Sequence, residues 1–171
     1  CYTNSESAAL FLNGKQIGEK KPLDPDTGLV FWDVPFSPGT LKAVGYDGEV
    51  PESGYEIHTA LRPLELKAVP DREVLDGKGS VAHVVVEILD DDGNVCKPAD
   101  NMISCTVEGP GELLGLESGS NTDMSVNTSD SRRAYRGRLM AYIRATGESG
   151  KITVRFSSPL LGGAETSITV E

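Results

Sequence analysis

Carboxylates and histidines are the side chains in this sequence that could take part in acid–base chemistry. The acidic residues gather in short clusters beside glycine or proline, at Asp24/Asp26, Asp71/Glu73 and 90–92. Hydrolysis by paired carboxylates requires the two groups about 5–9.5 Å apart across a cleft, whereas aspartates beside Gly and Pro usually cap turns. We therefore predict turn roles for these acids and assign no catalytic residue.

Cation binding is a second chemistry open to the carboxylates. The run DDDGN at 90–94 departs from a calcium loop, because the position that should carry the first ligand is Ile88. The polar segment Ser118–Asp130 is a looser candidate for ordering around a cation, because it holds Asn121, Asp123, Asn127 and Asp130. A plain surface loop is the competing interpretation of this segment.

The histidines and cysteines do not form a recognisable site. His58 and His83 have no Cys or His at metal-ligand spacing, and no GxSxG serine motif is present. Cys1, Cys96 and Cys105 lack the spacing of a structural zinc site. A Cys96–Cys105 disulfide and two buried free thiols are the alternatives, and no metal or cofactor is expected.

Two aromatic residues are candidates for contacting a sugar ring. Trp32 is the only tryptophan, and Tyr46 ends a nearby apolar run. An aromatic ring offers a large apolar surface with a polar edge, although a tryptophan in a β-sandwich usually belongs to the core. The complete set of predicted binding residues is Trp32, Tyr46, Asn121 and Asp123.

Composition limits the classes of partner. The chain has 171 residues, with 16 basic and 26 acidic side chains and a net charge of −10. This balance argues against nucleic acid, because phosphate binding needs a basic surface. No run of about 18 apolar residues is present, so no membrane span is expected. The chain starts at Cys1 without an initiator Met or a signal-like segment. A mature product and an excised piece of a longer protein are the two interpretations, and we expect the second.

The elements that would position these side chains are short strands. The 19 glycines and 10 prolines separate short apolar runs, a pattern typical of all-β proteins. A hairpin is predicted from 8–13 and 16–20 around Asn13-Gly14. A second hairpin is predicted from 31–34 and 41–46 around Pro38-Gly39, followed by a strand at 55–60.

The remainder of the chain alternates apolar and polar residues with period two. About seven strands over about 110 residues favour an immunoglobulin-like β-sandwich. We expect residues 1–60 to form a truncated, smaller β-sandwich accessory domain and residues 61–171 the immunoglobulin-like domain. Arg132 and Arg133 lie near the strand at 134–144, and at period two Arg136, Arg138 and Arg144 share one face. We predict that this face is solvated, and contact with an acidic partner domain is the alternative.

Five stretches of the sequence, taken in their order along the chain, point to a known protein family. They are YTNSESAALFLNGK at 2–15, WDVPFSPGTLKAVGY at 32–46, GPGELLG at 109–115, RAYRGRLMAYIRA at 133–145 and GKITVRFSSPLL at 150–161. Together they resemble the C-terminal region of family 2 glycoside hydrolases, the β-galactosidase-like group. The sequence departs from that family after 115, where a Gly-Asn-Gly-Asp turn is often found.

The resemblance implies two β-sandwich domains behind the catalytic barrel of a large secreted or periplasmic bacterial β-glycosidase. The catalytic glutamates of that family belong to the barrel and match no position here. We expect an accessory region that supports the barrel, the cleft rim or oligomer contacts, with the other domains of the glycosidase as partners. Carbohydrate is a further candidate ligand.

Two further readings of the sequence stay open. One is an autonomous carbohydrate- or protein-binding immunoglobulin-like module. The other is a homodimer formed through an unpaired strand edge near Tyr2, because such edges readily pair with another chain.

Overall fold

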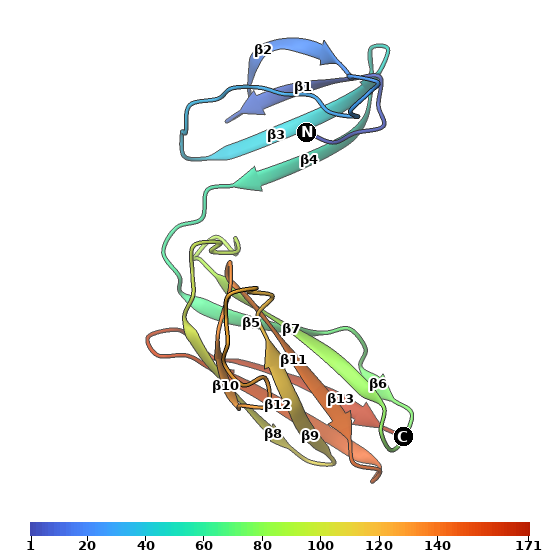
Figure 1. The fold of residues 1–171 in the computed structure, drawn as a ribbon, viewed down its shortest axis with the longest axis vertical. Helices are drawn as coiled ribbons and strands as arrows, with labels where there is room; N and C mark the ends of the chain where they lie inside the picture. Colours follow the sequence, from blue (N-terminus) through green and yellow to red (C-terminus); the bar gives the residue numbers. More distant parts are fainter. The chain divides into compact units, whose positions relative to one another are not determined.

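The computed structural model describes all 171 residues, which form thirteen β-strands and no helix (Figure 1). The all-β class predicted from the sequence is confirmed. The chain divides into two compact units, Cys1–Thr59 and Ala60–Glu171, hereafter the first and second units. It contains no helix with the length and apolar character needed to cross a lipid bilayer.

The first unit is one antiparallel sheet in the order β2-β1-β3-β4. Its strands are β1 (Ser7–Leu12), β2 (Lys15–Pro22), β3 (Thr40–Asp47) and β4 (Val50–His58). Asn13 and Gly14 join β1 to β2 with φ angles of 51° and 79°, as expected for the two-residue turn that this dipeptide favours. The first predicted hairpin is therefore confirmed.

The second predicted hairpin is wrong in its partners. Residues 31–34 form no strand, and β3 pairs instead with β1 and with β4. Pro35 and Pro38 have no N–H to donate to a sheet ladder. The segment 30–34 instead lines one face of the sheet, where Val30 is buried and Trp32 is half-buried.

The two turn motifs of the first unit contact each other. Asn13 donates from Nδ2 to the carbonyl of Pro38 at 3.1 Å and accepts at Oδ1 from the N–H of Thr40 at 2.8 Å. Gly39 has a φ of 126°, and a Cβ at this position would lie 1.9 Å from Oδ1 of Asn13. Glycine is required here both for its backbone conformation and for this close approach.

The second unit is a sandwich of two sheets, ordered β10-β8-β12-β13-β6 and β5-β7-β11-β9. The only parallel pair joins β6 to β13. This is the immunoglobulin-like arrangement, and the predicted β-sandwich is confirmed. Its strands are β5 (Glu65–Pro70), β6 (Val74–Leu75), β7 (Val81–Leu89), β8 (Met102–Glu108), β9 (Gly111–Glu117), β10 (Ser131–Arg133), β11 (Arg138–Ala145), β12 (Gly150–Ser157) and β13 (Ala164–Val170).

The core is divided very unequally between the units. Alternate residues of β7, β11 and β12 are buried between the two sheets, as the period-two pattern predicts: Ala82, Val84, Val86, Ile88, Leu139, Ala141, Ile143, Ile152, Val154 and Phe156. In the first unit only four hydrophobic side chains are buried, those of Ala8, Ala9, Leu10 and Val30. The second unit therefore has an extensive core of its own, and the first has very little.

The acidic clusters include carboxylates in the predicted turn roles. Asp90 is 1% exposed. It accepts hydrogen bonds from the N–H groups of Leu61 at 2.7 Å, Asp92 at 3.1 Å and Asn94 at 2.7 Å. Asp24 caps its own turn, accepting from the N–H two residues further on at 2.9 Å. These carboxylates hold backbone in place.

Candidate functional site

A hollow in the second unit lies beside the loop 118–130, which connects β9 to β10. The loop folds back on β9, where the N–H of Leu116 donates to the carbonyl of Asn127 at 2.8 Å. At its far end, the N–H of Cys105 in β8 donates to the carbonyl of Asp130 at 2.8 Å. Backbone hydrogen bonds to two strands therefore hold this loop.

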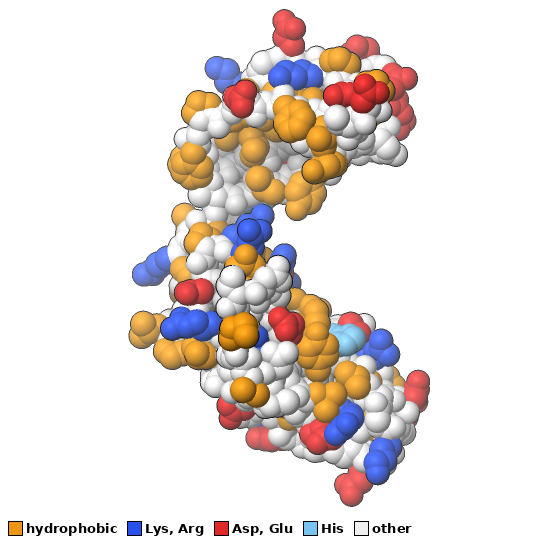
Figure 2. Space-filling view, in the orientation of Figure 1, with side chains coloured by type: hydrophobic (Ala, Val, Ile, Leu, Met, Phe, Trp, Pro, Cys, Tyr) orange, Lys and Arg blue, Asp and Glu red, His pale blue; other side chains and the backbone are white.

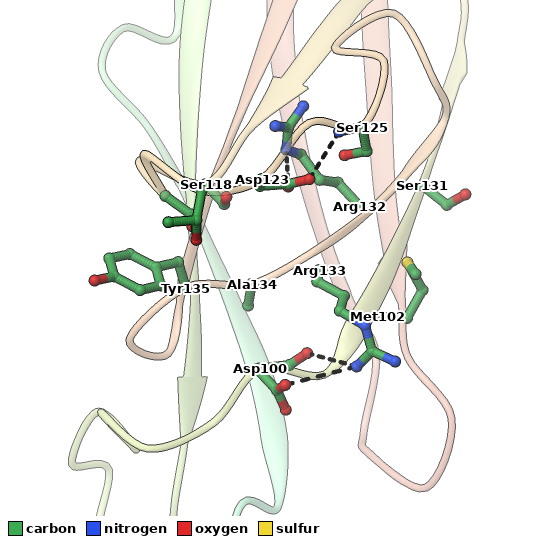
Figure 3. Close-up of a pocket in the computed structure, with 12 residues that line it drawn as sticks. Asp100, Met102, Ser118, Asp123, Ser125, Ser131, Arg132, Arg133, Ala134 and Tyr135 are labelled. Carbon is green, nitrogen blue, oxygen red and sulfur yellow. Dashed lines mark hydrogen bonds and ion pairs between the residues drawn. The ribbon is translucent and has the colours of Figure 1, made fainter.

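Arg132 of β10 is buried next to the loop, with 3% of its side chain exposed. Its Nε lies 3.0 Å from Oδ2 of Asp123. Its Nη1 donates to the carbonyl of Leu116 at 3.2 Å and to Oδ1 of Asn127. Figure 3 shows the guanidinium against Asp123. Because a buried guanidinium without partners is strongly destabilising, these contacts tie the loop to β9 and β10.

The charges around the hollow are paired. Hydrogen bonds from the hydroxyl and the N–H of Ser125, together with the charge of Arg132, hold the pKa of Asp123 below its ordinary value. Asp123 is therefore ionised at neutral pH and balances Arg132. Nearby, Nη1 of Arg133 lies 3.7 Å from Oδ2 of Asp100 and donates to its carbonyl at 3.2 Å.

The hollow has a volume of about 510 Å³, within the range of about 300–1,000 Å³ usual for small-molecule sites. Hydroxyl groups line much of it, from Ser118, Ser120, Thr122, Ser125 and Ser131. Tyr135 and Met102 lie at opposite edges of the group in Figure 3. Oγ of Ser118 is buried and has no hydrogen-bond partner. The site thus combines paired charges, hydroxyls and one aromatic ring.

The four sequence-predicted binding residues are not brought together. Asp123 lines the hollow of the second unit, and Asn121 is exposed on the same loop without lining it. Trp32 and Tyr46 belong to the first unit. The Tyr46 ring lies 5.0 Å from Nζ of Lys20, on the sheet face opposite to that of Leu41 and Ala43 by strand alternation.

A second hollow, of about 630 Å³, opens on one face of the first unit. Trp32 lines it from the segment 30–34, and Tyr55 and Ile57 line it from β4. Figure 2 shows hydrophobic side chains gathered around a hollow in this unit. Tyr2, Phe31 and Tyr55 are 86%, 68% and 75% exposed. We call this surface the open apolar face.

No position was predicted for the side chain of Arg132, which the loop 118–130 covers. Arg138 and Arg144 of β11 are exposed as predicted and pair with Glu87 at 2.9 Å and Glu112 at 2.6 Å. Arg132 pairs across the sheet with the buried Ile103. Its spacing of two residues from the buried Ala134 was the signal that could have indicated an inward position.

His83 packs against neighbouring side chains, and two of the three cysteines are buried. Nδ1 of His83 lies 3.1 Å from Oδ2 of Asp71, and its ring meets Tyr142 edge-on at 5.1 Å. All three cysteines are free, and Cys96 and Cys105 are buried, which confirms the thiol alternative. Nowhere in the chain do three His, Cys, Asp or Glu side chains come together as metal ligands would.

Comparison with known families matches both parts of the chain. Residues 66–167 match the model of glycoside hydrolase family 2 C-terminal domain 5. Residues 1–50 match a domain of unknown function, DUF4982. The chain is 35% identical over 173 residues to β-galactosidase BoGH2A of Bacteroides ovatus, covering 100% of this chain and 20% of that protein.

Solved structures of glycosidases match nearly the whole of this chain. A glycosyl hydrolase family 2 member from Bacteroides cellulosilyticus has a TM-score of 0.93 at 26% identity, covering 99% of this chain and 22% of that one. A β-glycosidase from Bacteroides vulgatus has a TM-score of 0.92 at 29% identity, with the same coverage. The chain thus spans about a fifth of the length of these relatives.

Proposed function

Because the chain belongs to glycoside hydrolase family 2, we propose that it is a non-catalytic accessory region of a longer, β-galactosidase-like glycosidase. Hydrolysis would take place in the catalytic barrel of that protein, in the periplasm or outside the cell. The structural use of carboxylates supports this proposal. Asp90 and Asp123 hold loops, and Asp71 accepts hydrogen bonds from His83.

The observation that carries the proposal is the open apolar face of the first unit. Only four buried hydrophobic side chains stabilise this unit from within, and burial of apolar area supplies most of the stability of a fold. Exposed contiguous apolar surface usually marks a site of interaction. We infer that this face packs against another part of the longer protein, and thereby supports the barrel, the cleft rim or the oligomer contacts.

Substitution of Tyr55 in the longer protein tests this packing. Tyr55→Asp removes little from the first unit itself, because the side chain is 75% exposed there. It would place a charge in the proposed contact, so we expect a lower melting temperature and slower hydrolysis of a nitrophenyl β-galactoside. The matched control is Leu160→Asp, at a fully exposed site in the second unit. Equal behaviour of the two variants would contradict the proposal.

The size of the protein in its source cells separates the proposed function from its main alternative. An immunoblot with antibody against this chain should detect a band several-fold heavier than 18.2 kDa. A band at 18.2 kDa would instead favour an autonomous binding module. One observation favours that alternative: Trp32 and Tyr55 line the same hollow, where quenching of Trp32 fluorescence by a glycan would report binding.

A further inference from the structure

We propose that the hollow beside the loop 118–130 is a binding site for a neutral saccharide. The site lies wholly within the second unit and is separate from the open apolar face of the first. It goes beyond the accessory role proposed above and does not depend on it, since each inference rests on a different surface.

The paired charges select against ionic ligands. Arg132 is matched by Asp123 at 3.0 Å, and Arg133 by Asp100 at 3.7 Å. A phosphate or a carboxylate would have to displace an aspartate from its arginine, in a chain whose net charge is already −10. A metal ion would find only two carboxylates, each already facing a guanidinium. A ligand without charge avoids these costs.

The hydrogen-bonding groups favour a ligand rich in hydroxyls. Serine and threonine hydroxyls both donate and accept, carboxylates accept, and guanidinium groups donate, so the lining can satisfy hydroxyl groups in either orientation. The hydroxyls of Ser120 and Thr122 lie 3.3 Å apart and bond each other, and each keeps further hydrogen-bonding capacity for a ligand.

Tyr135 provides the apolar contact that a sugar ring needs. Its side chain is 41% exposed at the edge of the hollow. The guanidinium carbon of Arg136 lies 5.4 Å from its ring centroid, which helps to fix the ring. A pyranose carries C–H groups on its faces and hydroxyls around its rim, so it could pack on Tyr135 while its hydroxyls bond Asp123 and the serine and threonine hydroxyls of the lining.

The loop is held in place before any ligand arrives. Hydrogen bonds from Leu116 and Cys105 secure its backbone, and Arg132 secures the side chains of Asp123 and Asn127. A preformed site loses less conformational entropy on binding than a flexible loop would. The hollow of about 510 Å³ has room for a small saccharide.

Nuclear magnetic resonance of the 171-residue chain tests the site. Galactose, glucose, lactose and cellobiose would be titrated separately, with glucuronate and inorganic phosphate as charged probes. We expect at least one neutral sugar to shift the amide signals of residues 118–125 and 131–135, while the charged probes leave them unchanged. Absence of shifts there with every neutral sugar would overturn the proposal, as would stronger shifts with glucuronate or phosphate.

Variants of Tyr135 supply the second measurement. Tyr135→Ala should weaken binding about tenfold by removing the aromatic surface, and Tyr135→Phe should restore it. The control is Tyr55→Ala on the open apolar face, which should leave sugar affinity unchanged. Equal affinities of Tyr135→Ala and the unmodified chain would contradict the proposal. These results are independent of the behaviour of Tyr55→Asp in the longer protein.

Discussion

Asp90 illustrates at the scale of a residue how a carboxylate that looks chemically available is used for structure. It accepts hydrogen bonds from Leu61, at the start of the second unit, and from the turn that follows β7. The N–H of Leu61, followed by the groups of Asn94 and Asp92, lowers its pKa against the opposing effect of burial. This carboxylate therefore couples the stability of the unit to pH.

We predict that Asp90 contributes to acid unfolding. Its folded-state pKa is below the unfolded value of about 3.9, so its stabilisation is present above that value and is lost as pH falls through the folded-state pKa. Urea unfolding at a series of pH values should show this loss in the unmodified chain and a shallower loss in Asp90→Asn. The neighbouring exposed Asp91, changed to Asn, should keep the original pH dependence.

The thiols offer a second prediction at the residue scale. Burial raises the pKa of the Cys105 thiol to about 12 and also raises that of Cys96. At pH 8 only about 10⁻⁴ of Cys105 would be thiolate, the reactive form. A thiol reagent such as Ellman's should modify one cysteine quickly in the folded chain and all three in urea. Cys1→Ser should abolish the fast phase, and two fast thiols would contradict the prediction.

At the scale of elements, the first unit depends on the contact between its two turn motifs. Gly39→Ala would push a methyl group into Asn13 and impose a strained φ, so we expect a loss of about 1–3 kcal/mol from the unfolding free energy of the first unit. Trp32, the only tryptophan, reports this transition by its fluorescence.

Gly54→Ala is the matched control for this substitution. Gly54 lies in β4, where an added Cβ would meet the carbonyl of Ala43 at 3.6 Å, an ordinary contact. The unfolding free energy should stay within about 0.5–1 kcal/mol of the unmodified chain. If Gly54→Ala lowered the unfolding free energy as much as Gly39→Ala does, the contact between Gly39 and Asn13 would not explain the loss.

The loop 118–130 depends in the same way on one buried side chain. Arg132→Met would leave the carbonyl of Leu116 and Oδ1 of Asn127 without their donor, at a cost of about 1–3 kcal/mol. Limited proteolysis should then cut the loop faster. Arg133→Met, at a side chain that is 63% exposed, should cost within about 0.5 kcal/mol, and equal effects would argue against the assigned role of Arg132.

At the scale of the whole molecule, the two units have very different cores. The first buries four hydrophobic side chains, whereas 22 are buried in the second. Since buried apolar area supplies most of the stability, we predict that the first unit unfolds at lower urea concentration. Trp32 fluorescence reports the first unit and Cys105 reactivity the second. Coincident midpoints would contradict this prediction.

The same imbalance connects the fold to the proposed function. A unit with a small core and an open apolar face gains stability when that face is covered, and the relatives of this chain are about five times longer. The dimer predicted through an edge near Tyr2 stays a prediction. Tyr2 forms only an isolated bridge to Leu29, and the outer strands of the sheet are β2 and β4.

Local pattern in the sequence was sufficient for much of the fold. The alternation in 81–89 determines which side chains enter the core, because successive residues of a strand point to opposite faces. Asn13-Gly14 determines a hairpin, because both positions tolerate positive φ. The ordered motifs from 2–15 to 150–161 were sufficient to indicate the family. Each of these signals depends on neighbours within a few residues.

Only the tertiary structure decided the positions that depend on distant segments. Arg132 is buried because the loop 118–130 folds back on β9 and β8 and covers it, and 31–34 forms no strand because it lines a face made by β1, β3 and β4. Asp123 lines a hollow whereas Asn121, two residues away, does not. Burial and pairing of this kind arise from contacts between residues far apart in the chain, which local propensity does not encode.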